Sequence, residues 1–221
     1  MKTVAFVPIK TNNERLPGKN TRCFSNGVPL IAYVLRTLEQ VKGLDEIYVY
    51  CSDEAVKEYL PQGVRFLKRS RELDLSTTSF NQVLISFAND VEADIYLLAH
   101  ATAPFIKKES FERAIGAVKG GGHDSALAVQ KMQEFFWKDG APANYDPSQI
   151  PRTQDLAPFY METCGMYVYT AALMKGEGRR IGHSPCLIEV SKIEGVDIND
   201  AEDFMIADGV SSMFQKNGEG F

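Results

Sequence analysis

Short apolar runs alternate along the first half of the chain with longer stretches of helical spacing. The apolar runs are rich in β-branched and aromatic residues and predict four buried strands, at residues 3–8, 46–51, 64–67 and 94–99. The stretches between and after them carry apolar residues along one stripe or begin at a capping residue, and predict helices at 29–41, 52–60, 79–90 and 107–119. Strands and helices that alternate at these lengths predict a three-layer α/β fold. Its mostly parallel sheet carries helices on both faces.

The second half of the chain follows this alternation less closely. Its patterns predict strands at 125–130, 163–170 and 187–190, a short helix at 201–208 and a loose tail at 211–221. Between residues 130 and 160, four prolines interrupt helical spacing, and aromatic residues gather at Phe135, Phe136, Trp137 and Tyr145. We therefore expect one domain over residues 1–221, with residues 130–160 forming an arm that leaves the sheet.

Composition and charge exclude several classes of protein. The chain has 221 residues, of which 44% are hydrophobic and 24% charged, with a net charge of −5. This is the composition of a globular protein, and without basic blocks it predicts no nucleic-acid partner. The apolar run before Pro8 is too short for a signal peptide or a membrane span, so we expect a cytoplasmic protein without a membrane partner. The four cysteines form no CxxC pair, which argues against a zinc or redox site.

Candidate chemistry lies at the predicted carboxyl ends of the strands, where open α/β sheets bind ligands. The loop after the first strand reads PIKTNNERLPGKN and holds Lys10, Arg15 and Lys19 within ten residues. Three cations among amide side chains suit a triphosphate, although a solvated basic turn remains open on these residues alone. The P-loop sequence GxxxxGK[ST] and the dinucleotide fingerprint GxGxxG are both absent, which disfavours a dinucleotide oxidoreductase.

The same loop resembles the N-terminal signature of the sugar cytidylyltransferases. It is similar to the loops of CMP-sialic acid synthetases (acylneuraminate cytidylyltransferases) and of CMP-Kdo synthetases. Further resemblances follow in order along nearly the whole chain, in PLIAY at 29–33, HATAPF at 100–105, RTQDL at 152–156 and VDIND at 196–200. The resemblance implies a nucleotide-diphospho-sugar transferase-like fold. It also implies that the arm at 130–160 joins two copies into a homodimer and helps to complete the partner's sugar pocket.

The resemblance also implies a reaction and a set of site residues. CMP would pass from CTP to an acidic sugar, a sialic acid or a related nonulosonic or ulosonic acid, with release of pyrophosphate. The implied catalytic residues are Lys10, Arg15, Lys19 and Asp197. The implied nucleotide site comprises Pro8, Ile9, Lys10, Asn13, Arg15, Lys19, Asn20, Arg69, Ser79 and His100. The implied sugar site comprises His100, Thr102, Arg152, Gln154 and Tyr167. Mg²⁺, for which Mn²⁺ can substitute, would be held by Asp197 and Asn199.

Two alternative functions stay open at this stage. His100, Thr163 and Cys164 replace residues that the family carries on its sugar side, so another acidic acceptor, such as a phosphonate, is one alternative. The other is a glycosyltransferase-like or non-catalytic protein that binds a nucleotide sugar. Such a protein has no need of three cations around a triphosphate, so the first loop favours nucleotidyl transfer.

Overall fold

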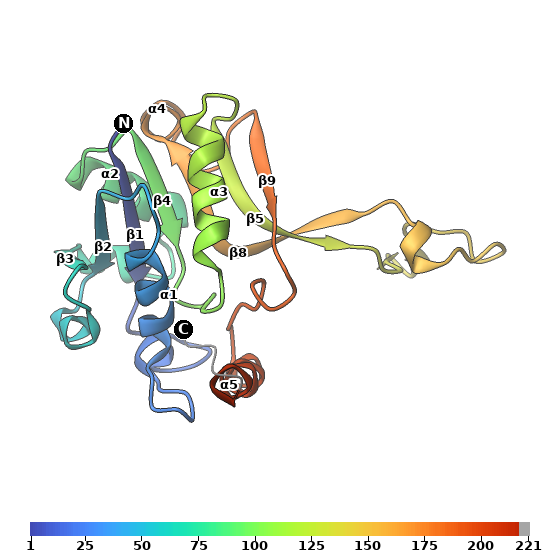
Figure 1. The fold of residues 1–221 in the computed structure, drawn as a ribbon, viewed down its shortest axis with the longest axis horizontal. Coiled ribbons are helices and arrows are strands. Elements are labelled where there is room, and N and C mark those ends of the chain that lie inside the picture. Colours follow the sequence, from blue (N-terminus) through green and yellow to red (C-terminus); the bar gives the residue numbers. More distant parts are fainter. Residues whose placement is uncertain (217–221) are drawn as a thin grey trace.

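The fold is built on one seven-stranded sheet with helices on both faces (Figure 1), in a computed structural model that describes residues 1–216. The strands stand in the order β3-β2-β1-β4-β8-β5-β9. Their bounds are Thr3–Ile9 for β1, Glu46–Cys51 for β2, Arg65–Lys68 for β3, Ile95–Ala99 for β4, Ser125–Met132 for β5, Phe159–Thr170 for β8 and Pro185–Glu189 for β9. The strand β8 runs antiparallel to both of its neighbours, whereas the other strand pairs are parallel.

Residues 1–216 form five α-helices, namely α1 (Leu30–Glu39), α2 (Phe80–Asp90), α3 (Lys108–Lys119), α4 (Ala171–Glu177) and α5 (Ala201–Lys216), of which the first four pack on the faces of the sheet. Residues of α1 and α3 share one buried cluster with alternate residues of the strands, and residues of α2 and α4 share a second cluster with the others. The two clusters therefore lie on opposite faces of the sheet. The predicted three-layer α/β fold with a mostly parallel sheet is confirmed.

Several predicted elements differ in length or type. The segment expected as a helix at 52–60 forms a 3₁₀ helix, Glu54–Tyr59, before Pro61. The helix α4 was not predicted, because its seven residues are too few to show a clear period.

The prediction of a short helix at 201–208 and a loose tail from residue 211 is wrong for the part that the structure describes. The helix α5 continues to Lys216, because Phe204, Ala207, Val210 and Phe214 extend one apolar stripe onto a cluster that also contains Phe24 and Phe105. Residues 217–221 lie outside the described part of the chain.

The strands β5 and β8 run beyond the sheet as a two-stranded stalk, and the segment between them projects far from the body (Figure 1). This segment contains the short strands β6 (Trp137–Lys138) and β7 (Ala141–Pro142) and the 3₁₀ turn Thr153–Asp155. Across residues 1–216, no helix combines the length and the apolar character that a bilayer crossing requires.

Candidate active site

The loop after β1 opens at the carboxyl edge of the sheet. The strand ends at Ile9, whose side chain lies in the core, while Pro8 is half-buried. The loop turns back at Gly18, which adopts a left-handed conformation with φ of 66° that favours glycine. It then enters the 3₁₀ helix Lys19–Thr21, where Asn20 is buried and donates from Nδ2 to the Lys10 carbonyl at 3.1 Å. This turn holds both ends of the loop in place.

Lys19 is the most constrained cation of the loop. Its side chain is buried, and its Nζ donates to the Ile198 carbonyl at 2.5 Å. Burial lowers the pKa of Lys19, while the nearby carboxylate of Asp197 acts in the opposite direction. The ammonium group is thus fixed between the first loop and the segment around Asp197, which are remote in the sequence.

Arg15 reaches the same segment from the exposed side of the loop. Its guanidinium donates to Asn199 Oδ1 at 2.9 Å, and Asn199 Nδ2 in turn donates to Asp197 Oδ2 at 2.9 Å. The backbone N–H of Ile198 donates to the Thr102 carbonyl at 2.8 Å, which joins this segment to the loop after β4. These contacts bring together two of the predicted cations, both predicted metal ligands and the backbone of Thr102. The residues are Arg15, Lys19, Asp197, Asn199 and Thr102.

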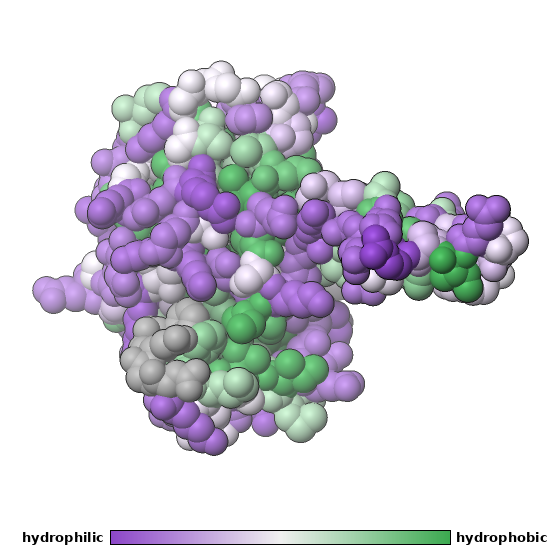
Figure 2. Space-filling view, turned by 45° about the vertical axis from the view of Figure 1, so that its right-hand side comes forward, coloured by the Kyte–Doolittle hydropathy of each residue, from purple (hydrophilic) through white to green (hydrophobic). Residues whose placement is uncertain are grey.

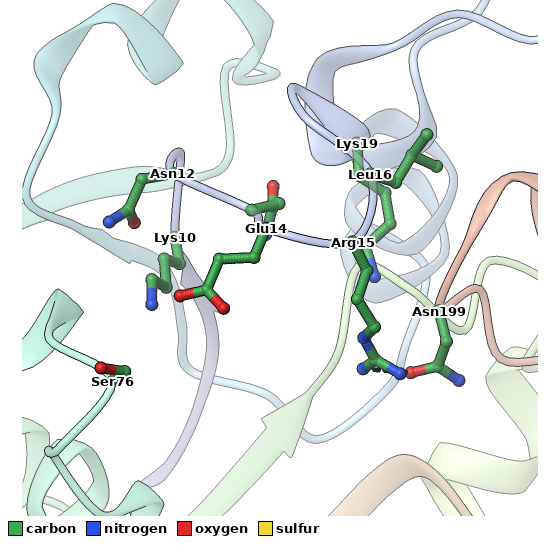
Figure 3. A pocket seen from close by; sticks show the side chains of 9 residues that line it. Lys10, Asn12, Glu14, Arg15, Leu16, Lys19, Ser76 and Asn199 are labelled. Atoms are coloured by element: carbon green, nitrogen blue, oxygen red, sulfur yellow. Dashed lines mark hydrogen bonds between the residues drawn. The ribbon is translucent and has the colours of Figure 1, made fainter.

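An open cavity of about 390 Å³ lies over the first loop (Figure 3). Its lining residues are Lys10, Asn12, Asn13, Glu14, Arg15, Leu16, Lys19, Ser76 and Asn199. In the close view the Arg15 side chain points toward Asn199, and Ser76 lies across the cavity from it. The Oδ1 atom of Asn13 is buried and has no hydrogen-bond partner within residues 1–216. The three cations suit a polyanionic ligand, and the unpaired amide oxygen, which accepts hydrogen bonds, suits a donor group of that ligand.

A smaller cavity of about 180 Å³ adjoins the first one and shares Lys10 with it. Pro8, Arg69 and Phe80 also line it. Arg69 is buried and donates to Asp74 Oδ1 at 2.6 Å, and Ser52 donates to the other oxygen of Asp74. Asp74 thereby orients the guanidinium, a role that no sequence pattern indicated.

Ser79 begins α2 rather than lining either cavity. Its backbone N–H donates to Gln82 Oε1 at 2.8 Å, as in a capping box.

His100 follows β4 at the junction of the two predicted ligand sites. Its ring stacks on Phe80 at 5.3 Å between centroids and meets the ring of Tyr167 edge-on at 6.4 Å. Its Nε2 atom is buried without a hydrogen-bond partner in the described chain. Burial, reinforced by the charges of Arg180 and Lys19, lowers the pKa of His100 to about 3. The ring is therefore neutral at neutral pH and can exchange one hydrogen bond with a ligand.

This pKa predicts a pH dependence of stability. The unfolded chain binds a proton at His100 near pH 6.5, and the folded chain does so only near pH 3. Stability is therefore lost as pH falls through this window. We expect His100→Gln to lose less stability than the wild type between pH 6.5 and pH 4, measured by urea unfolding. His183→Gln removes an exposed histidine and is the matched control. Equal losses in wild type and His100→Gln would contradict the assignment.

A bulge in β8 shapes the floor beside His100. Leu127 pairs with Tyr167 and Val129 with Glu162, so Ala128 alone faces residues 163–166. At Gly165 a Cβ atom would lie 2.2 Å from Ile106 Cδ1, and its carbonyl accepts a hydrogen bond from the His100 backbone at 3.1 Å. The glycine thus permits the close approach of β8 to the loop after β4. Tyr167, just beyond the bulge, is buried and donates to Glu162 Oε2 at 2.7 Å.

The predicted sugar residues of the arm, Arg152 and Gln154, lie away from this site in the single chain. Arg152 and Gln154 lie on the projecting segment (Figure 1), and neither lines a cavity described above. Arg152 is exposed and makes a bidentate ion pair with Asp155, at 2.7 and 3.1 Å.

Sequence reasoning missed Arg180, which lies beside His100. Its Cζ atom is 3.6 Å from the centroid of the Tyr167 ring. The sequence offers only an Arg-Arg pair after a helix, which carries no signal of this contact.

The donor set around Asp197 fits a hard cation that shares its ligands with a phosphate. Residues 1–216 contain no group of three or more histidine, cysteine, aspartate or glutamate side chains that could hold a metal ion by themselves. Mg²⁺ needs no such cage, since it is held by one or two carboxylates together with water and substrate phosphates. Asp197, at the edge of a cavity lined by cations, can supply one carboxylate.

Comparison with known proteins points to one family. Residues 4–175 match the profile of the family described as Cytidylyltransferase. The chain is 28% identical over 207 residues to the N-acylneuraminate cytidylyltransferase of Oncorhynchus mykiss, covering 88% of this chain and 48% of that protein. It is 31% identical over 122 residues to the CMP-N,N'-diacetyllegionaminic acid synthase of Legionella pneumophila, covering 52% of each. The chain spans about half the length of these curated relatives.

A solved structure shares the fold. The chain superposes on a CMP:2-keto-3-deoxy-manno-octonic acid synthetase complexed with CTP, with a TM-score of 0.73 and 17% sequence identity, covering 96% of this chain and 99% of that one. The architecture predicted from the sequence and its resemblance to known proteins are confirmed by these comparisons.

Proposed function

The chain belongs to the cytidylyltransferase family, and from this premise we propose that it transfers CMP from CTP to an acidic sugar and releases pyrophosphate. The acceptor is a sialic acid or a related nonulosonic or ulosonic acid. The observation that carries the proposal is the cavity in which Lys10, Arg15 and Lys19 meet the segment around Asp197. A protein that only binds a nucleotide sugar, without meeting a triphosphate, would not need so dense a set of cations.

The reaction joins the anomeric oxygen of the sugar to the α-phosphorus of CTP while the bond from that phosphorus to the leaving pyrophosphate breaks. Such a transfer depends on positioning and on neutralising charge more than on a covalent nucleophile. Lys10, Arg15 and Lys19 neutralise the phosphates. The Asn20 amide supports the loop that carries them, and Asn13 offers its unpaired amide oxygen to the nucleotide. Pro8 and Arg69 border the nucleoside, since both line the smaller cavity, and the Ile9 backbone lies between the lining residues Pro8 and Lys10.

Asp197 holds Mg²⁺, or Mn²⁺ in its place, and the ion when bound supplies further neutralisation of the developing pyrophosphate charge. The oxygen of Asn199 accepts from Arg15 and its nitrogen donates to Asp197. Asn199 therefore orients the carboxylate and ties it to the cation, besides being a candidate ligand itself. Thr102 fixes this segment through its carbonyl, and Ser79 begins the helix that borders the nucleoside.

The acceptor lies on the side of His100 and Tyr167. Arg152 and Gln154 take part only if the arm of a second copy reaches across, so we propose a homodimer built by residues 130–160. Large hydrophobic side chains exposed on the arm support this, among them Phe135, Trp137, Ile150, Phe159 and Tyr160. Figure 2 shows a small green area on the projecting arm among purple and white residues. We propose the cytoplasm as its location, because all four cysteines are free and two of them are exposed.

The dimer is tested by placing a charge on the arm. Trp137 is 63% exposed, and Trp137→Asp is expected to convert the dimer to monomers and to lower sugar turnover while CTP still binds. Light scattering at micromolar concentration measures the mass. Lys138→Asp, one position along the same strand, is the control for charge alone. A wild-type monomer with full activity would sink the dimer and favour an arm that folds over its own site.

The function is tested by pyrophosphate release with CTP, magnesium and a panel of acidic sugars and one phosphonate. A thermal shift with CTP, UTP, ATP and GTP at equal magnesium complements it, because a ligand that binds only the folded state raises stability by RT ln(1 + [L]/Kd). We expect CTP to give the largest shift and one acidic acceptor to give release. Preference for a purine triphosphate would overturn the proposal.

A further inference from the structure

Arg180 is a half-buried cation that has no neutralising partner in the described chain. Its Cζ atom lies 3.6 Å from the centroid of the Tyr167 ring and 5.3 Å from the centroid of the Phe80 ring. Within residues 1–216, the half-buried guanidinium makes no ion pair or hydrogen bond. The two other arginines that are not exposed are both paired, Arg69 with Asp74 and Arg179 with Glu177. The described arginines that also lack an ion pair or hydrogen bond, such as Arg36 and Arg71, are exposed to solvent. Arg180 therefore differs from them in being half-buried without a partner of opposite charge.

The position of Arg180 joins it to the active site. Phe80, which it contacts, lines the smaller cavity together with Lys10 and Arg69 and stacks on His100. Both Arg180 and Lys19 lie close enough to His100 to lower its pKa. Arg180 therefore extends the row of cations from the phosphate cavity to the side on which the acceptor is proposed to bind.

The ring beneath Arg180 holds its side chain in a defined place. Tyr167 is 1% exposed, and its hydroxyl is tied to Glu162 at 2.7 Å. A guanidinium that stacks on an aromatic ring uses its flat face, which leaves the N–H donors at its edge available for an oxoanion. The neutral ring of His100 adds a buried Nε2 that also lacks a partner in the described chain. A half-buried cation without an ion pair thus adjoins a buried nitrogen without a hydrogen-bond partner in the described chain.

We propose that Arg180 binds the oxoanion of the acceptor, a carboxylate or a phosphonate, and so determines which acceptors this site takes. The inference rests on the proposed function and deepens it. An anionic acceptor supplies the negative charge that no carboxylate of the described chain provides to Arg180. A partly desolvated cation gains most from such a partner. Arg152 cannot serve this purpose within one subunit, since it lies on the arm and is already paired with Asp155.

The test compares Arg180→Met, which keeps the bulk of the side chain and removes its charge, with Arg179→Met at the neighbouring arginine. Initial rates of pyrophosphate release are measured with a nonulosonic acid, an ulosonic acid, the methyl ester of each and a hydroxyalkylphosphonate. We expect Arg180→Met to raise the KM for the preferred acid by about 10- to 100-fold, the range for a hydrogen bond to a charged group. Its preference for the acid over the ester is expected to fall by the same factor. Arg179→Met is expected to keep both values.

The panel of acceptors also identifies the anion that Arg180 binds. If a sugar acid saturates the enzyme, the anion is a carboxylate; if the phosphonate does, it is a phosphonate. Unchanged KM and acid-over-ester preference in Arg180→Met would overturn the inference. The inference would also be overturned if Arg180→Met lost the CTP thermal shift as strongly as it lost acceptor affinity, because Arg180 would then only support packing. Calorimetry of acceptor binding with a non-hydrolysable CTP analogue separates the two proposals. Absence of pyrophosphate release would overturn the function, whereas absence of acid binding to the wild type, or equal binding to Arg180→Met, would overturn the role of Arg180.

Discussion

Replacing Lys19 with methionine is expected to lower turnover by about 100-fold or more while the protein stays folded. The ammonium group is buried between the first loop and the segment around Asp197, where it donates to the Ile198 carbonyl at 2.5 Å. A charge held in such a place needs no rearrangement to meet a developing pyrophosphate, and electrostatic groups of this kind contribute about 10²-fold or more each. Methionine keeps the aliphatic stem and removes the charge.

The effect is measured as kcat and as the KM for CTP in the pyrophosphate-release assay, with thermal unfolding as the check on folding. Lys42→Met, at an exposed lysine after α1, is the matched control and is expected to keep wild-type kinetics. Burial lowers the pKa of Lys19, so we expect the turnover of the wild type to fall at a lower alkaline pH than the pH at which an exposed lysine loses its proton. Turnover of Lys19→Met within threefold of the wild type would contradict a catalytic role for Lys19 and would leave the loop with a structural role only.

Replacing Asp197 with asparagine is expected to leave about 1% of wild-type activity or less. The change removes the carboxylate that we assign to the metal ion and leaves only neutral amide side chains at the two candidate ligand positions. Without the ion, the charge of the leaving pyrophosphate is met only by the lysines and arginine of the first loop. The wild type is correspondingly expected to lose activity in excess EDTA and to regain it with Mg²⁺ or Mn²⁺.

The measurement is turnover as a function of Mg²⁺ concentration. Asp197→Asn is expected to need a higher concentration for half-maximal activity as well as to reach a lower plateau. Asp208→Asn serves as control, because Asp208 is also a carboxylate of the C-terminal segment but accepts hydrogen bonds from Ser25 instead. Full activity of the wild type in EDTA, or of Asp197→Asn at ordinary Mg²⁺, would remove both the metal and the role of this residue.

The sequence by itself determined those features that depend on residues close together in the chain. Strand and helix alternation follows from apolar spacing over 4 to 12 residues, and it predicted the layers and the mostly parallel sheet. The three cations of the first loop are visible because they fall within ten residues, and Asp197 because it stands in the short segment VDIND. The arm was predicted from local signals too, namely prolines and aromatic residues that fit neither period.

Only the tertiary structure decided which of these groups meet. Lys19 contacts Ile198 across 179 positions and Arg15 contacts Asn199 across 184, because the fold brings the loop after β1 and the segment before α5 to the same edge of the sheet. The antiparallel course of β8 places Tyr167 beneath Arg180 and next to His100. The pKa of His100 and the missing partner of Arg180 in the described chain depend on burial and on charges from other elements. Local spacing encodes the period of an element but not the desolvation of a side chain, which arises only when distant elements close around it.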